Sequence, residues 1–434
     1  MFSEFKSSSA ADWKNQIIKD LKGEPYESLI WHNENGCDIQ PFYTSEDLKQ
    51  IYEPAFTHAD WDICVNAVPG NTATNTNAFL LKNLNRGASS ISLNTIGVDL
   101  DKALHNIQLN VIQSTFFTDP EKAAELKKYF EKHDGSTALQ ASLFPQDFSK
   151  STDLQEWSKV ISLFKNKPEI RTISVDVTSF HNQNCHATYE LALIFSMLVE
   201  YLERLSENEE FPSSTIVIKT GVSSDFFVQI AKLRAIRRLW TLFQKEYNIN
   251  NKLHLIVETS LCNKSASDSY TNLVRTTVEA MAAVAGGCNE LLVNEFDVLL
   301  ERDRELSQRM AINQQLILKD EAYLNKMADI ACGSYYLESI TDVFAAKALH
   351  TFKRFETEGG FFKCLEKKII AKEIAAQAAQ KRDLIENQTD LIIGINKYRN
   401  ENEKTSLSEA ALKALTALPL NNPVLQFELK HIFS

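Results

Sequence analysis

The side chains of this chain that could do chemistry are polar and mostly uncharged, and they follow short apolar runs. Three such segments are Ser179–Gln183, Gly221–Ser224 and Thr259–Asn263. Serine, threonine and amide groups can position a ligand by hydrogen bonds but are weak acids and bases. His181 is the one group among them that could act as a general acid near neutral pH. The alternative interpretation, and the more common one for a single histidine, is a ring hydrogen-bonded to a loop or a helix start.

Several familiar catalytic and metal-binding motifs are absent from the sequence. It has no GxxxxGK[ST] phosphate loop, no GxGxxG after a strand, no HExxH and no GxSxG. His181 and His186 have no carboxylate-rich or cysteine pattern beside them, and the seven cysteines include no CxxC pair. We therefore expect no metal site and no disulfide scaffold. Scattered cysteines of this kind are typical of buried thiols in a reducing compartment.

The polar segments follow eight apolar runs that alternate with helical patterns, which predicts parallel strands joined by crossover helices. Eight such units predict a closed (β/α)8 TIM barrel, whose reactive groups lie at the carboxyl ends of the strands. An open doubly wound sheet is the second candidate, because the spacing around residues 89–112 is short. The expected strands are Ile63–Val68, Ser89–Asn94, Ile107–Ile112, Thr137–Ser142, Thr172–Val177, Thr215–Thr220, Leu253–Glu258 and Glu290–Phe296. The remaining polar or turn-forming strand ends are Pro69–Thr72, Thr95–Gly97, Ser114–Thr115, Leu143–Pro145 and Asp297.

Three regions are expected along the chain. Residues 1–38 form an N-terminal extension with an amphipathic helix over Asp12–Leu21, residues 39–358 form the barrel, and residues 359–434 form a helical C-terminal linker or tail. In the tail, helices are expected over Phe361–Asn387 and Ser406–Leu415, with a strand or extended arm over Leu391–Tyr398 between them. The barrel helices are expected over Asn77–Leu84, Glu121–Glu131, Leu154–Phe164, Thr188–Leu205, Asp225–Tyr247 and Tyr270–Ala285. The cations of the fifth helix are expected to form a solvated face, and they are Lys232, Arg234, Arg237 and Arg238.

The composition is that of a globular protein, with 44% hydrophobic and 24% charged residues. The formal charge of −11 disfavours non-specific binding to nucleic acid or to an anionic membrane surface. No run approaches the roughly 18 apolar residues of a membrane span, and the N-terminus lacks the apolar core of a secretory signal. We therefore expect a cytoplasmic protein with no nucleic-acid or membrane partner.

Five strings, in this order, resemble the methylmalonyl-CoA mutase family over roughly residues 29–399. The family's barrel entry resembles Asp38–Thr44, and its "VRTT-EA…GG" helix resembles Val274–Ala280 followed by Gly286-Gly287. Its "NSFDE", "GGSYYVE" and "IGVNKYR" strings resemble Asn294–Asp297, Gly333–Glu338 and Gly394–Arg399. The resemblance implies a TIM barrel in an isomerase that interconverts methylmalonyl-CoA and succinyl-CoA with adenosylcobalamin.

The same comparison shows which family motifs are missing. Active subunits carry a C-terminal flavodoxin-like domain that binds adenosylcobalamin through a DxHxxG motif, and this sequence has no such motif. The family's Arg-x-Tyr segment corresponds to Asn66–Thr72, where both residues are lost, and its His-Cys-Gln strand end matches Val257–Cys262 poorly. Its Tyr-His pair resembles Phe180-His181, which leaves His181 as a vestigial candidate.

These losses imply a small, non-catalytic subunit that covers and stabilises a large catalytic subunit in a heterodimer. The adenosylcobalamin would then lie on the large subunit, and this chain would have no catalytic residue and bind no cofactor or metal. One alternative is an acyl-CoA mutase barrel that receives cobalamin on a separate small protein. Another is a CoA-thioester-binding regulatory protein. The sequence leaves open whether a CoA channel remains through the barrel and whether the isolated chain forms a homodimer.

Overall fold

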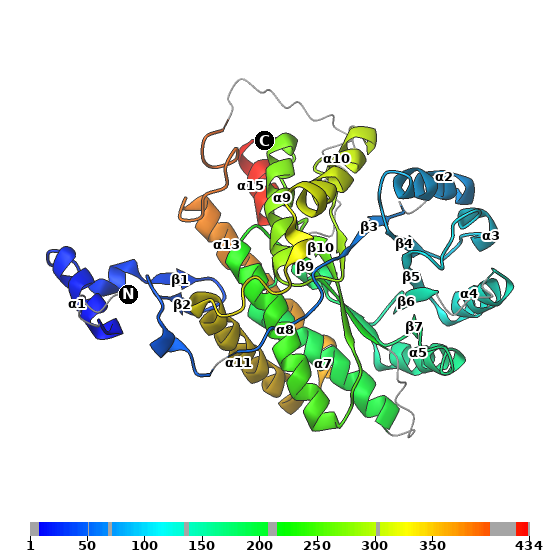
Figure 1. Cartoon of the computed structure of the whole chain (residues 1–434), viewed down its shortest axis with the longest axis horizontal. Helices are drawn as coiled ribbons and strands as arrows, with labels where there is room; N and C mark the ends of the chain where they lie inside the picture. Colours follow the sequence, from blue (N-terminus) through cyan, green and yellow to red (C-terminus); the bar gives the residue numbers. More distant parts are fainter. Residues whose placement is uncertain are drawn as a thin grey trace.

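A parallel β-barrel lies at the centre of the computed structural model, which describes residues 8–50, 52–67, 72–133, 139–206, 215–300, 304–399 and 422–432 (Figure 1). Its strands pair in the order β7-β6-β5-β4-β3-β11-β10-β9-β8, and every pairing is parallel. They are β3 (Asp62–Asn66), β4 (Ser90–Asn94), β5 (Gln113–Thr118), β6 (Gln140–Pro145), β7 (Ile170–Arg171), β8 (Ser174–Asp176), β9 (Ile216–Val222), β10 (Leu253–Thr259) and β11 (Glu290–Leu292).

The barrel closes through one interrupted strand. β7 pairs with β6, and β8, three residues further along, pairs with β9 on the other side. The Ser174 hydroxyl also donates to the Leu143 carbonyl of β6 at 2.6 Å. Residues 170–176 therefore serve as the fifth of eight barrel strands, and the TIM-barrel prediction is confirmed.

The predicted third strand was wrong. Residues 107–112 form a turn after the short helix α3 (Leu100–Ala103), and β5 begins only at Gln113. Ile107 and Leu109 are nevertheless buried, because they pack in the layer between the barrel and its helices. Their alternation with polar residues imitates a half-buried strand. The fourth strand also begins later than expected, at Gln140, and Thr137 lies outside the described residues.

Helices surround the barrel as predicted (Figure 1). In α8, the expected stripe is buried from Ile230 to Phe243. A later helix, α11 (Tyr335–Thr357), packs against α7 and α8 and adds an outer layer. The surrounding helices are α2 (Ala73–Leu84), α4 (Pro120–His133), α5 (Ser151–Leu163), α6 (Thr178–His181), α7 (Ala187–Ser206), α8 (Phe226–Tyr247), α9 (Ser269–Ala285) and α10 (Arg304–Leu316). Short helical turns are η1 (Tyr26–Leu29), η2 (Ser45–Asp47), η3 (Ile317–Glu321) and η4 (Leu324–Lys326).

The N-terminal segment holds α1 (Ala10–Asp20) and an antiparallel hairpin of β1 (Trp31–Asn33) and β2 (Cys37–Ile39). Helix α1 has no buried residue and lies apart from the barrel in Figure 1. The C-terminal segment holds α12 (Phe361–Glu366), α13 (Ile369–Glu386) and α15 (Pro423–His431). Between α13 and α15, residues 391–398 form turns with one isolated bridge, and the helix expected over 406–415 lies outside the described residues. The region boundaries near residues 38 and 358 stay predictions.

Charged side chains fill the two ends of the barrel bore, where aliphatic residues are usual in such barrels. At the amino end, the Glu290 carboxylate lies 2.6 Å from His254 Nε2 and 3.8 Å from Arg171 Nη1. At the carboxyl end, Lys219 Nζ lies 3.1 Å from the Asp176 carboxylate and 2.8 Å from that of Glu258. Both charge clusters are buried or nearly so.

A central layer separates the two charge clusters. Its apolar part is a cluster of Phe144, Val217 and Ile256, against which Phe117 packs with a ring separation of 5.2 Å from Phe144. No central-layer side chain exposes more than 4% of its surface. The bore is therefore filled along this layer, whose members are Phe144, Val217, Ile256, Ser92, Thr115 and Ser142.

The expected solvated cationic face of α8 was wrong. Lys232 and Arg234 are fully buried, and both are held by carboxylates from other elements. Arg238 is mostly buried and pairs with Glu338 and Asp342 of α11. These cations therefore join α8 to its neighbours instead of facing water.

The seven cysteines are free thiols, and six of them are buried. Burial raises the pKa of the Cys288 thiol to about 12, so the thiol stays protonated at neutral pH. Within the described ranges, no helix combines the length and apolarity needed to cross a membrane.

Candidate functional site

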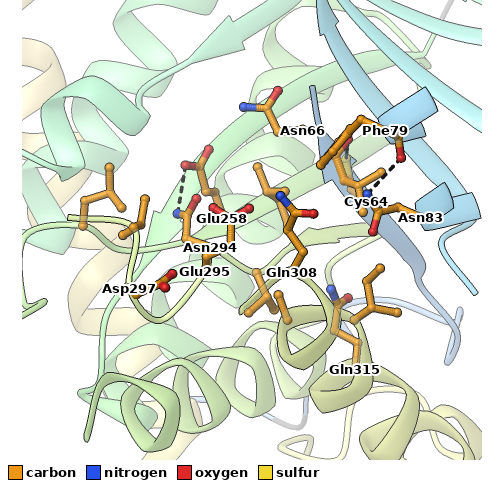
Figure 2. Close-up of a pocket in the computed structure, with 17 residues that line it drawn as sticks. Cys64, Asn66, Phe79, Asn83, Glu258, Asn294, Glu295, Asp297, Gln308 and Gln315 are labelled. Atoms are coloured by element: carbon orange, nitrogen blue, oxygen red, sulfur yellow. Dashed lines mark hydrogen bonds between the residues drawn. The ribbon is translucent and has the colours of Figure 1, made fainter. Parts of the chain in front are cut away.

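The carboxyl-terminal mouth of the barrel contains a recess of about 290 Å³ (Figure 2). This is the face at which barrel enzymes place their active sites. The walls are the ends of β3, β10 and β11 together with helices α2 and α10. The labelled polar side chains of Figure 2 are Asn66, Asn83, Glu258, Asn294, Glu295, Asp297, Gln308 and Gln315.

Glu258 and Asn294 hold each other in place in the recess. The Asn294 amide donates to a Glu258 oxygen at 3.1 Å (Figure 2). It also donates to the Thr259 carbonyl at 2.6 Å. The other Glu258 oxygen is 2.8 Å from Lys219 Nζ, inside the bore. Glu258 therefore links the recess to the charge cluster beneath it, and its negative charge is compensated there.

The opposite side of the recess is formed in part by Asn83 of α2 and Gln315 of α10 (Figure 2). The Asn83 amide donates to the Phe79 carbonyl at 3.0 Å, while its own oxygen is buried without a partner. The Gln315 oxygen accepts from Trp61 Nε1 at 3.2 Å. Amides and carboxylates of this kind can orient a small polar molecule. The recess has no histidine, lysine or serine among its described lining residues, and its ionisable groups are the carboxylates of Glu258, Glu295 and Asp297 and the Cys64 thiol.

His181 does not reach this recess. It lies at the end of α6, exposes 5% of its surface, and places Nδ1 3.0 Å from the Glu190 carboxylate of α7. Lys232 Nζ of α8 is 3.1 Å from the same oxygen, and the Thr220 hydroxyl donates to the other. Burial alone would raise the pKa of Glu190, but Lys232 and His181 outweigh it and hold this pKa at about 2. His181 is thus part of a buried ion-pair cluster, and its status as a vestigial catalytic residue stays a prediction.

Of the other predicted strand ends, some lie within strands and one lines the recess. Ser114, Thr115, Leu143 and Phe144 lie within strands, because β5 and β6 run further along the chain than predicted. Asp297 lines the recess and is 3% exposed, and Pro69–Asn71 lie outside the described residues. The residues that sequence reasoning missed are Asn66, Glu258 and the α10 glutamines. For Glu258, the signal was the alternation of β10, which turns His254, Ile256 and Glu258 to the same side.

Gly221→Ala is expected to destabilise the protein by about 1–3 kcal/mol through overpacking. A Cβ at Gly221 would lie 2.1 Å from Cδ2 of His181, whose ring is held by Glu190. Urea unfolding of Gly221→Ala, His181→Ala and the double variant measures the coupling. The cost of Gly221→Ala should fall when the ring is already gone, and strictly additive losses would contradict this contact.

The comparisons with known proteins agree with this architecture. The family model described as methylmalonyl-CoA mutase matches residues 145–416, which is more than half of the chain. The chain is 28% identical to the methylmalonyl-CoA mutase small subunit of Porphyromonas gingivalis over 93% of its length, and covers 72% of that protein. It is 26% identical to the mutase of Rhizobium meliloti and 27% identical to the mitochondrial mutase of Bos taurus, over 91% of its own length.

The chain spans 64% and 61% of the lengths of these two longer relatives. Its closed parallel barrel, with the family strings in their expected order, agrees with the match of the family model. The chain belongs to the methylmalonyl-CoA mutase family.

Proposed function

We propose that this chain is the non-catalytic small subunit of a heterodimeric, adenosylcobalamin-dependent methylmalonyl-CoA mutase. A large subunit would isomerise methylmalonyl-CoA to succinyl-CoA, and this chain would cover and stabilise it in the cytoplasm. The observation that carries the proposal is the filled bore. Phe144, Val217 and Ile256 expose at most 1% of their surface, and charge clusters lie on both sides of them. A CoA chain could pass along the barrel axis only after these side chains moved.

The recess at the barrel mouth does not fit adenosylcobalamin. The recess at the barrel mouth has a volume of about 290 Å³, which is smaller than a corrin ring with its side chains, and none of its described lining residues is a histidine. The imidazole of His181 is 5% exposed and packs against Glu190 and Gly221. This supports placing the cofactor on the partner subunit.

A relative named as a small subunit supports the same assignment, since such a name implies a large partner. The proposal is tested by purifying this chain alone, and again after co-expression with a longer mutase homologue from the same genome. The chain alone, supplied with adenosylcobalamin and methylmalonyl-CoA, is expected to give no succinyl-CoA. The co-purified pair is expected to elute as a one-to-one complex and to turn over.

Turnover by this chain with adenosylcobalamin alone would overturn the proposal. Turnover only after addition of a separate small cobalamin protein would favour the alternative of a split mutase. Tight binding of methylmalonyl-CoA to the isolated chain, without a large-subunit complex, would favour a regulatory CoA-thioester-binding protein. Light scattering of the isolated chain shows whether it forms a homodimer in the absence of its partner.

A further inference from the structure

A second cavity, of about 690 Å³, lies outside the bore and shares no lining residue with the mouth recess. Its volume is in the range of about 300–1,000 Å³ that is common for small-molecule sites. Its walls come from the N-terminal hairpin at residues 31–35, the starts of α7 and α8, the Cys262-Asn263 segment after β10, and the C-terminal segment around α13 and α15.

The side chains that line this cavity include more carboxylates than lysines. Lys232 is 3.1 Å from the Glu190 carboxylate, and Lys381 Nζ lies 3.0 Å from that of Glu34 and 2.5 Å from that of Asp390. Carboxylates therefore outnumber lysines by two. The titratable lining residues are Glu34, Glu190, Asp225, Asp390, Lys232, Lys381, His32, His181, His186, Cys185 and Cys262.

Asp225 is the carboxylate left without a cation. It lies at the start of α8 and accepts a hydrogen bond from the Asn33 amide at 3.3 Å, and the described residues give it no ion pair. Burial, and next the negative charge of Glu34, raise the pKa of Asp225 to about 6. A carboxylate that is partly buried and repelled by its neighbour favours the arrival of a positive charge.

Gln229 supplies a second acceptor one turn further along α8. Its side-chain amide donates to the Ser223 hydroxyl at 2.9 Å, while its oxygen is buried without a partner and the residue is 4% exposed. Residues four apart on a helix lie on the same face, so Asp225 and Gln229 are neighbours along this wall. His181 Nε2 is also buried without a partner, while its Nδ1 faces the Glu190 carboxylate.

We propose that this cavity binds a small organic amine in its protonated form, with the ammonium group between the Asp225 carboxylate and the Gln229 side-chain oxygen. An ammonium has three donors and one positive charge, which match the Asp225 carboxylate without an ion pair and the unpartnered Gln229 oxygen. A bare metal ion fits less well, because the described residues contain no group of three histidine, cysteine or acidic side chains placed to hold one. The site is independent of the proposed mutase role, since it needs no large subunit.

The test is isothermal titration of the full chain with 1,4-diaminobutane at pH 8 and moderate salt, with 1,4-butanediol as the uncharged probe. One saturable site is expected for the diamine, and binding of the diol should be at least about tenfold weaker, as for loss of a charged hydrogen bond. Asp225→Asn should weaken binding of the diamine by about tenfold or more. Glu125→Gln removes an exposed carboxylate on α4, outside the cavity, and should leave binding unchanged.

Folding of Asp225→Asn is checked by thermal unfolding. Because its pKa is raised, charged Asp225 destabilises the folded state in full above pH 6, and this penalty shrinks as the pH falls from 6 to the ordinary pKa of 3.8. The variant should therefore melt at a higher temperature than the parent at pH 8, and the difference should narrow steadily below pH 6. Equal binding of diamine and diol, no saturation, or equal weakening by Asp225→Asn and Glu125→Gln would each overturn the proposed site.

Discussion

Arg234→Met is expected to lower the free energy of unfolding by about 3–5 kcal/mol, as for removal of one partner from a buried ion pair. Arg234 lies in the middle of α8 with none of its surface exposed. One of its amino groups contacts the Asp329 carboxylate, and the other is 2.7 Å from that of Glu338. The variant leaves both carboxylates buried, and only Glu338 keeps a second cation, Arg238. Urea unfolding of variant and parent under the same conditions measures the loss.

A surface pair of the same chemistry provides the control. Arg354 bonds Glu373 through both amino groups at 2.6 Å, but its side chain is 46% exposed. Arg354→Met should cost no more than about 1 kcal/mol, since exposed ion pairs contribute little. Equal losses for the two variants would show that burial of Arg234 does not determine its contribution. A triple variant that also makes Asp329 and Glu338 neutral should recover part of the loss.

This arginine shows what sequence patterns reveal and what they leave out. The spacing of Ile230, Leu233 and Ile236 correctly predicted a buried stripe on α8. The acidic partners of Arg234 lie 95 and 104 residues further along the chain, where no local pattern connects them to α8. The cations therefore resembled a solvated face, although tertiary packing buries them.

The family strings also show that a sequence resemblance does not reveal the role of each residue. Glu338, within the Gly333–Glu338 string, pairs with Arg234 and Arg238, and Glu279 of the Val274–Ala280 string bonds Lys264 at 2.8 Å with both residues fully buried. The resemblance identified the family from these strings, but the structure gives them roles in holding the scaffold. They therefore establish the fold more firmly than they establish catalysis.

The site was predictable in outline only. Parallel strands alternating with helices predict a mouth lined by strand ends, and Glu258 and Asn294 do lie there. The sequence also singled out His181, but its partner Glu190, and Lys232, which pairs with the same carboxylate, come from two other helices. Whether the bore was open could not be inferred, because its filling depends on side chains from several strands, far apart in the sequence, that meet at one axis.

Glu290→Ala tests that filled bore and is expected to lower the free energy of unfolding by about 3–5 kcal/mol. Glu290 is fully buried at the amino end of the barrel, where it contacts His254 at 2.6 Å, accepts from Ser90 and lies 3.8 Å from Arg171. Alanine would leave the Arg171 guanidinium buried without its carboxylate and open a void in the bore. Urea unfolding measures the loss, and Glu305→Ala on α10, whose side chain is 58% exposed, should change stability by less than about 1 kcal/mol.

The acid dependence of Glu290→Gln separates the charge from the packing. Burial alone would raise the pKa of Glu290. The hydrogen bond and the charge interaction with His254 are the largest opposing effects, and together with Ser90 and Arg171 they hold this pKa below 4.5. The stability that the charge contributes is therefore complete above pH 4.5 and is lost as the pH falls through the lower, folded-state pKa. Glu290→Gln should destabilise clearly at pH 7 and progressively less below pH 4.5. A loss that stays constant with pH would mean that shape, and not the ion pair, holds this end of the bore closed.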